Sequence, residues 1–331
     1  MLPFRSFRTR RSMVGVALCV AATLGIAGCS PATESTNSTT QAEANAGPVT
    51  FTDMDGVEVN LDKAPEKVAV LDYAALDIME SLGLSDKVVG ISGAGGKLPE
   101  FVTKYDIIDG GQREPDIEAL AQAEPDLIIG GPRNIGRDKN MRGKLEKVAP
   151  VANLGVTFND FSLANNEQLV KTVAEIFGKT AEAEQELEKI RKRAEQISAK
   201  AQTAGPTLTL MASGGEISAF GPKSRFGLAF SDLGFTQAAD VGAQSPRHAD
   251  AVSFEFIANA KPETIFILDR DAAIGQAGEA ASATLDNALV NATPAAKENR
   301  IFPIDSSYWL LVNGGLNSMN KMLDDIEAAL K

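Results

Sequence analysis

The sequence predicts an α/β protein made of two Rossmann-like lobes that are joined by one long α-helix. Short apolar strands alternate with helix-forming segments in both halves of the chain, which favours parallel sheets. One unit occurs twice, since Glu118–Ile129 and Glu255–Ile267 both place a proline seven positions after the leading glutamate, just before an apolar strand. A third segment, Thr180–Ala201, lies between the two units and is strongly helix-forming. Two lobes of similar construction explain the repetition, and chance similarity of two α/β units is the alternative.

The first 28 residues have the features of a secretory signal rather than of a folded domain. Four arginines precede an apolar stretch, Met13–Ala27, that is too short to span a bilayer comfortably. The stretch runs through small residues to Cys29, and this arrangement resembles the lipobox of bacterial lipoproteins. The resemblance implies that Cys29 is lipidated with acyl chains such as palmitate and becomes the mature N-terminus. An uncleaved anchor with an incidental cysteine is the alternative.

Residues 29–47 are rich in Ser, Thr, Ala, Asn and Glu, so we expect a flexible tether between the lipid anchor and the folded protein. Cys19 leaves with the signal, and Cys29 would then be the only cysteine of the mature chain. A disulfide framework, a thiolate metal site and a cysteine nucleophile are therefore excluded. The whole chain has a formal net charge of −12, and loss of the four arginines makes it more acidic, which argues against nucleic acid as a partner.

The N-terminal lobe is expected to span residues 48–178. It opens with alternating residues Val49–Leu61 around Asp55-Gly56, which indicates a hairpin. A buried strand at 68–71, a helix at 74–82, a strand at 88–91, the first repeated unit, a helix at 141–148, a strand at Val151 and a helix through 169–177 follow. The segment Gly93–Lys97 resembles a phosphate-binding loop, but it lacks the first glycine and the Ser/Thr of that pattern, so we exclude a nucleotide site.

The linking helix is expected within residues 179–203, and the C-terminal lobe within residues 204–331. Apolar residues of Thr180–Ala201 recur at steps of three and four residues with charges between them, which is typical of an amphipathic helix. A helix bends less readily than a loop, so we expect small movements between the lobes. The C-terminal lobe should contain strands at 207–212, 217–220 and 301–304, helices at 224–233 and 285–290, the second repeated unit and a terminal helix from Asn317.

These features together resemble the substrate-binding lipoproteins of ABC importers for iron–siderophores, cobalamin and haem, also known as class III substrate-binding proteins. The similarity covers nearly the whole mature chain. Segments Gly215–Gly227, His248 with Ser253-Phe-Glu255, Leu268-Asp-Arg270, Leu285–Leu289 and Tyr308–Gly315 resemble the subgroup that binds ferric catecholate or petrobactin-type siderophores. The resemblance implies a ligand cleft between the lobes, at the extracytoplasmic face of a membrane to which lipid anchors the protein. It also implies a monomer without enzymatic activity that works with an ABC permease and its ATPase.

The resemblance also assigns roles to individual residues. His248 and Tyr308 correspond to the two protein ligands of iron that are used when a siderophore supplies only four donors. Arg133, Arg225 and Arg270 correspond to arginines that face the anionic ligand, and Trp309 beside Tyr308 is a further ligand-binding candidate. Glu118 and Glu255, which lead the two repeated units, correspond to glutamates that dock on the permease. The cargo is then a ferric siderophore, and no cofactor is permanently bound.

The chemistry of these residue types fits the roles, although each has a simpler explanation. Imidazole suits iron and a phenolate suits Fe(III), but a loop histidine is often only solvated and Tyr308 could pack against Trp309. The guanidinium groups match catecholate oxygens, but Arg270 or Arg225 could instead pair with Asp269 or Asp232. Glu118 and Glu255 could simply be favoured by the positive ends of their helices.

Three other functions remain as alternatives. A haem or cobalamin receptor could use the same fold, but a haem slot needs more aromatic residues than this chain offers. A direct zinc or manganese receptor needs several histidines or carboxylates around one ion, and the chain has a single histidine. A membrane-anchored hydrolase would rely on His248 as its only imidazole base, and no G-x-S-x-G segment is present.

Overall fold

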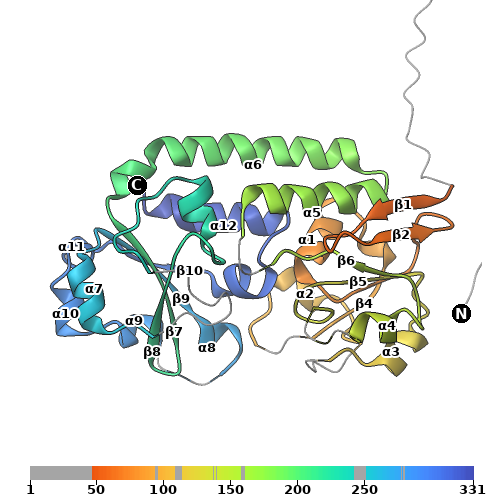
Figure 1. Cartoon of the computed structure of the whole chain (residues 1–331), viewed down its shortest axis with the longest axis horizontal. Coiled ribbons are helices and arrows are strands. Elements are labelled where there is room, and N and C mark those ends of the chain that lie inside the picture. The colour runs from red at the N-terminus through yellow and green to blue at the C-terminus, as the bar shows by residue number, and fades with distance from the viewer. Residues whose placement is uncertain are drawn as a thin grey trace, which may run out of the picture. The chain divides into compact units, whose positions relative to one another are not determined.

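Four parallel strands in the order β4-β3-β5-β6 form the sheet of the N-terminal lobe. The computed structural model describes residues 47–93, 96–108, 114–136, 138, 140–157, 161–241, 251–276, 278 and 280–331, which belong to one compact unit (Figure 1). Every residue of β3 and β5 is buried, as expected for central strands of a parallel sheet. The elements of this lobe are β3 (Val68–Val70), α1 (Tyr73–Ser81), η1 (Ser85–Lys87), β4 (Val88–Ile91), α2 (Glu100–Thr103), α3 (Ile117–Gln122), β5 (Leu127–Gly130), α4 (Met141–Leu145), β6 (Val151–Asn153) and α5 (Leu163–Ile176).

The predicted hairpin precedes this sheet. Strands β1 (Val49–Thr52) and β2 (Glu58–Leu61) pair in antiparallel register, with Val49 opposite Leu61. The buried Asp53 organises the turn, since its carboxylate accepts the backbone N–H groups of Asp55 and Val57. The same carboxylate binds Arg142 of α4 at 2.7 Å and accepts the Asn153 N–H at 3.0 Å, so it fastens the hairpin to the edge of the sheet.

The C-terminal lobe has a mixed sheet in the order β10-β9-β7-β8. The predicted parallel pairing holds for β10, β9 and β7, while β8 differs because it pairs with β7 in antiparallel register. Only Gly214 and Gly215 separate them, both at positive φ, and a connection of two residues can join only antiparallel strands. The elements are β7 (Thr207–Ser213), β8 (Glu216–Phe220), η3 (Leu228–Asp232), α7 (Phe254–Ala260), β9 (Thr264–Asp269), α8 (Arg270–Ala273), α9 (Ala281–Thr284), α10 (Ala288–Asn291), α11 (Pro294–Lys297), β10 (Ile301–Ile304), η4 (Ser307–Val312) and α12 (Asn317–Ala328).

Two predicted helices of this lobe differ in form. The segment predicted as helix 224–233 contains a π-helix, η3, over Leu228–Asp232. The segment predicted as helix 285–290 becomes helical only from Ala288, because the Asn287 side chain accepts the Leu289 N–H and caps the helix there.

The structure confirms the predicted repetition. In each lobe a short capped helix, α3 or α7, leads through a proline into a strand that is flanked on both sides, β5 or β9. The residue before the proline has an unusual left-handed backbone in both units, with φ of 47° at Glu124 and 46° at Lys261. Both copies therefore share details of backbone geometry as well as a pattern of residue types.

Helix α6 (Thr180–Ala201) is the predicted linking helix, and η2 (Gln202–Ala204) continues it. At about 1.5 Å per residue, it is about 33 Å long. It buries an apolar stripe that includes Leu187, Ile190 and Ile197 and lies alongside α5 and α12 (Figure 1). Arg193 on this helix donates to the Asn320 carbonyl at 2.9 Å, which adds a polar contact to α12.

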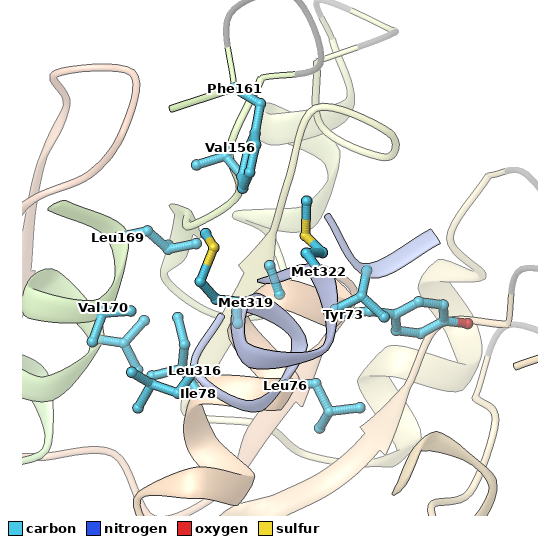
Figure 2. Packing of buried hydrophobic residues seen from close by; sticks show 14 of the residues in the cluster. Tyr73, Leu76, Ile78, Val156, Phe161, Leu169, Val170, Leu316, Met319 and Met322 are labelled. Carbon is cyan, nitrogen blue, oxygen red and sulfur yellow. The ribbon is translucent and has the colours of Figure 1, made fainter. Parts of the chain in front are cut away.

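The last helix of the chain packs against β10 and η4 of the C-terminal lobe and also against α1 of the N-terminal lobe. Figure 2 shows this packing, in which side chains of α12 and its N-terminal flank lie among residues of α1 and α5. The labelled residues of these three elements are Tyr73, Leu76 and Ile78 from α1, Leu169 and Val170 from α5, and Leu316, Met319 and Met322 from the C-terminal segment. The predicted boundary at residue 204 therefore marks a change of sheet, while the last helix contacts elements of both lobes. Among the described residues, no helix has both the length and the apolar character needed to cross a membrane.

Candidate functional site

Three arginines from the two lobes converge on one place. Burial, together with the positive charges of Arg133 and Arg270, lowers the pKa of Arg225 to about 9. Arg133 follows β5 and Arg270 follows β9, so the repeated units supply two members of the cluster and the segment after β8 supplies the third. A guanidinium remains protonated at neutral pH, so the cluster concentrates positive charge within an acidic chain. An anionic ligand would relieve this repulsion.

The side chain of Arg133 points towards the C-terminal segment, and its Nη2 donates to the carbonyl oxygen of Leu310. The turn that carries it is fixed by the buried Asn134, which donates to the Leu71 carbonyl and accepts the Gly131 N–H. Packing favours glycine at position 131, because a Cβ there would lie 2.1 Å from Oδ2 of Asp72.

Arg270 is the first residue of α8 and is partly exposed. Its Nη1 lies 3.1 Å from the Ser213 hydroxyl and 3.8 Å from the Asp271 carboxylate. The alternative of a pair with Asp269 finds no support, since the Asp269 carboxylate accepts the N–H groups of Ala272 and Ala281, both at 2.9 Å. Arg270 therefore keeps donors for a ligand at the end of β9.

Trp309 has a different place from the one predicted. Its side chain is fully buried, so it offers no surface to a ligand. The indole N–H donates to Asp325 at 2.9 Å, and the ring stacks on Phe226 with 5.6 Å between centroids. Phe226 follows Arg225 directly, so Trp309 supports the segment that carries this arginine.

Tyr308 is half-buried in η4, and its charged neighbours are carboxylates. Burial raises the pKa of its phenol, and the negative charges of Asp305, Asp77 and Glu100 raise it further. The free protein therefore holds Tyr308 protonated, and binding to iron would require loss of this proton. The proposed partner ligand His248 lies outside the described residues, as do Cys29, the signal and nearly all of the tether.

Glu118 and Glu255 are exposed at equivalent positions in the first turns of α3 and α7. Asp116 caps the first helix and Ser253 caps the second, each by accepting backbone N–H groups. The backbone N–H of Glu255 and the Ser253 hydroxyl hold the pKa of Glu255 below its usual range. Both glutamates lie where the positive end of a helix favours a carboxylate, and both are exposed enough to contact a partner protein.

Two carboxylates near these residues, the partly buried Asp72 and the buried Asp77, are absent from the sequence-based prediction. Burial raises the pKa of Asp72 to about 6, against the effects of the Ala75 and Ala74 N–H groups and the Arg133 charge. Burial likewise raises the pKa of Asp77 to about 6. Asp72 could have been found as an N-cap, since it stands between an apolar strand and a helical run. Asp77 has no comparable local signal.

Other places in the described residues are poor candidates. None of their His, Cys, Asp and Glu side chains form a group of three that could hold a metal ion. A groove of about 460 Å³ lies between β2 and the edge strand β6, with Val57, Val148 and Arg142 among its lining residues. Arg142 is already paired with Asp53 there, so the groove lacks a free charge for an anion.

Comparisons with known proteins identify the family of the chain. The family model described as "Periplasmic binding protein" matches residues 68–308. The petrobactin-binding protein YclQ of Bacillus subtilis is 32% identical over 84% of this chain and 86% of its own, and its crystal structure superposes with a TM-score of 0.77. The ferric-anguibactin-binding protein FatB of Vibrio anguillarum is 28% identical over 80% of this chain and 83% of its own. The catecholate-siderophore binding protein VctP of Vibrio cholerae is 28% identical, with a TM-score of 0.75 over 85% of this chain and 99% of its own. The chain belongs to the periplasmic binding protein family.

Proposed function

We propose that this protein is the substrate-binding component of an ABC importer and captures a ferric siderophore of the catecholate or mixed catecholate type. The observation that carries the proposal is the arginine cluster, in which Arg133, Arg225 and Arg270 come together from both lobes. Catecholate complexes of Fe(III) are anionic, and planar guanidinium groups bind such oxygens with charge-assisted hydrogen bonds. The name of VctP states a catecholate siderophore, and those of YclQ and FatB state petrobactin and ferric anguibactin, which supports a ferric siderophore as the ligand.

The iron is cargo in this proposal. Fe(III) accepts about six donors, so a siderophore that supplies four leaves two positions for the protein. His248 and Tyr308 would fill these positions with one nitrogen and one phenolate oxygen. The ferric ion would have to displace the proton that the surroundings of Tyr308 retain, and a bound cation favours such a displacement strongly.

The remaining parts of the proposal concern location and partners. Residues 1–28 would direct export, Cys29 would carry the lipid, and residues 29–47 would connect the lipid to the folded protein. The loaded monomer would deliver its cargo to a membrane permease that an ATPase drives. The family consists of binding proteins rather than enzymes, which leaves the hydrolase alternative without support. Haem or cobalamin remains the alternative cargo.

A panel of ligands tests the function directly. Ferric catecholates should quench the fluorescence of Trp309, the single tryptophan, because its ring stacks on the residue next to Arg225. The panel should include ferric tetradentate and hexadentate catecholates, a ferric hydroxamate, haem and cobalamin, with isothermal titration as a second measurement. Tight binding of haem or cobalamin, with no response to any ferric catecholate, would overturn the proposal.

The variant Tyr308→Phe tests direct ligation. We expect it to remove the phenolate-to-iron charge-transfer band and to weaken tetradentate complexes about tenfold, while hexadentate complexes change little because they leave no open position on iron. Absorption spectra and titrations of both complexes provide the measurement. Equal losses for the two denticities would argue that Tyr308 acts through packing rather than as a ligand.

The variants Glu118→Gln and Glu255→Gln test docking on the permease. Each is expected to lower uptake of iron by cells several-fold, and the double variant should nearly abolish it, while affinity for the ferric siderophore stays unchanged. The exposed Glu195 on α6 gives a control, because Glu195→Gln removes the same charge away from both repeated units. Normal uptake by the double variant would show that these glutamates serve only their helices.

A further inference from the structure

The glycine-rich segment that ends in Lys97 has no nucleotide to bind, but the structure gives it a different partner. Gly96 of the N-terminal lobe lies against residues Ala273–Gly275 at the end of α8 in the C-terminal lobe. The Lys97 N–H donates to the Ala273 carbonyl at 3.1 Å. The Lys97 carbonyl accepts the Ser307 hydroxyl at 2.9 Å. Lys97 is thus tied to the element that carries Arg270 and to the one that carries Tyr308.

This contact requires glycine on both sides. A Cβ on Gly96 would lie 2.1 Å from the Ala273 carbonyl oxygen and 2.7 Å from the Cα of Ile274. A Cβ on Gly275 would lie 2.9 Å from the Cα of Gly96. All three neighbours are backbone atoms, which cannot swing aside as the end of a side chain can. Either substitution must therefore push the two lobes apart at this point.

The position of the contact connects it to the arginine cluster. Helix α8 has only four residues, Arg270–Ala273, so its last residue lies one turn from Arg270. The Ile274 N–H donates to the Arg270 carbonyl at 3.1 Å, which makes the turn a single hydrogen-bonded unit. A displacement of Ala273 by the N-terminal lobe would therefore reach Arg270 directly.

We propose that Gly96–Lys97 and Ala273–Gly275 form an inter-lobe clasp that positions Arg270 against the ligand and slows its release. The clasp rests on the proposed function for its ligand, and it adds Gly96, Gly275 and Ser307 as positioning residues. These residues act through Arg270 and through the separation of the lobes, without touching the siderophore. Because related complexes differ mostly in their dissociation rates, the clasp should be seen chiefly in the rate of release.

The variants Gly96→Ala and Gly275→Ala test the clasp in the full folded chain. Each is expected to speed dissociation of a ferric tetradentate catecholate about tenfold or more, with a smaller change in association. The double variant should lose little more than either single variant, because both break one contact. Ser307→Ala, which introduces no clash, should speed release about threefold.

Matched controls separate the clash from backbone strain. Gly56 has φ of 79° and Gly83 has φ of 70°, close to the 84° of Gly96 and the 67° of Gly275, and a Cβ would meet no atom within 4 Å at either site. Gly56→Ala and Gly83→Ala should therefore share the strain of the test variants and release the ligand at the wild-type rate. Wild-type release by Gly96→Ala, Gly275→Ala and Ser307→Ala would overturn the clasp.

Hydrogen exchange of the Lys97 amide in ligand-free protein gives a measurement that is independent of the siderophore. The amide should be protected in the wild type and in both control variants, and it should exchange at least tenfold faster in Gly96→Ala and Gly275→Ala. If the wild type binds no siderophore, the proposed function fails. The exchange rate of the Lys97 amide still shows whether the contact between the lobes forms. Unchanged exchange in both test variants would contradict the clasp whatever ligand the protein takes.

Discussion

Replacing Asp77 by alanine is expected to lower the free energy of unfolding by about 3 kcal/mol. Asp77 lies on α1, and its Oδ2 accepts the N–H groups of Leu316, Asn317 and Ser318 at 2.6, 2.9 and 3.3 Å. These are the first donors of α12, which otherwise have no partner within their helix. Alanine would leave them buried and unsatisfied, and the contact that fixes the end of the chain to the N-terminal lobe would be lost.

Chemical denaturation with urea, followed by circular dichroism, measures this loss. The exposed Asp62 supplies a control, since Asp62→Ala removes an aspartate without uncapping a helix and should change stability little. Asp77→Asn keeps one oxygen acceptor in place and should fall between the wild type and Asp77→Ala. A loss below about 1 kcal/mol for Asp77→Ala would mean that water replaces the carboxylate at the start of α12.

The pH dependence of stability identifies the carboxylate itself. Burial raises the pKa of Asp77 to about 6 from a usual value of 3.8, so the folded protein binds the proton more tightly than the unfolded chain does. The contribution of Asp77 to the free energy of unfolding is fully present below the unfolded pKa, and it is lost as pH rises through the folded pKa. Asp77→Asn should therefore lose less stability than the wild type as pH rises from about 4 to about 7, the range that spans the unfolded and the folded pKa of the aspartate.

Local patterns in the sequence predicted the parts of the fold that depend on neighbouring residues. The apolar stripe of α6, the hairpin at Asp55-Gly56 and the strands after Pro125 and Pro262 all follow from short-range periodicity and turn chemistry. The antiparallel β8 was open to the same reasoning, since Gly214-Gly215 between two apolar runs is a hairpin signal. The alternation of strands and helices elsewhere in the lobe predicts parallel neighbours only, so it does not reveal this antiparallel pair.

The site was harder to predict from the sequence than the fold, because its key contacts join residues far apart in the chain. Resemblance to a family, rather than any local pattern, identified the three arginines as ligand-binding residues. In the structure they lie close enough for Arg133 and Arg270 to lower the pKa of Arg225. Trp309 was assigned to the ligand because it adjoins Tyr308, but adjacent residues in η4 face different surroundings, and the indole points into the core. The cap from Asp77 spans 239 positions to Leu316, and no local rule indicates such a partner.

Replacing Arg225 by glutamine is expected to weaken binding of a ferric catecholate at least 100-fold, while stability of the ligand-free protein stays at or above that of the wild type. The two effects differ because the three positive charges repel one another in the free protein and bind the anion in the complex. Without an anion, the partly buried Arg225 lies beside two like charges, and this arrangement lowers its pKa. With the anion bound, the same guanidinium gains charge-assisted hydrogen bonds, and removing one partner of a buried pair costs about 3–5 kcal/mol.

Titration by tryptophan fluorescence and urea denaturation, carried out on the same preparations, measure both effects. Lys223 is an exposed cation two residues away, so Lys223→Gln removes equal charge from the same segment and should leave affinity within about twofold of the wild type. Arg225→Lys keeps the charge but not the planar fork, and it should recover only part of the affinity if catecholate oxygens are bound by paired N–H donors. An Arg225→Gln protein that binds as tightly as the wild type, or that unfolds markedly more easily, would make Arg225 a structural residue and would leave the anion to Arg133 and Arg270 alone.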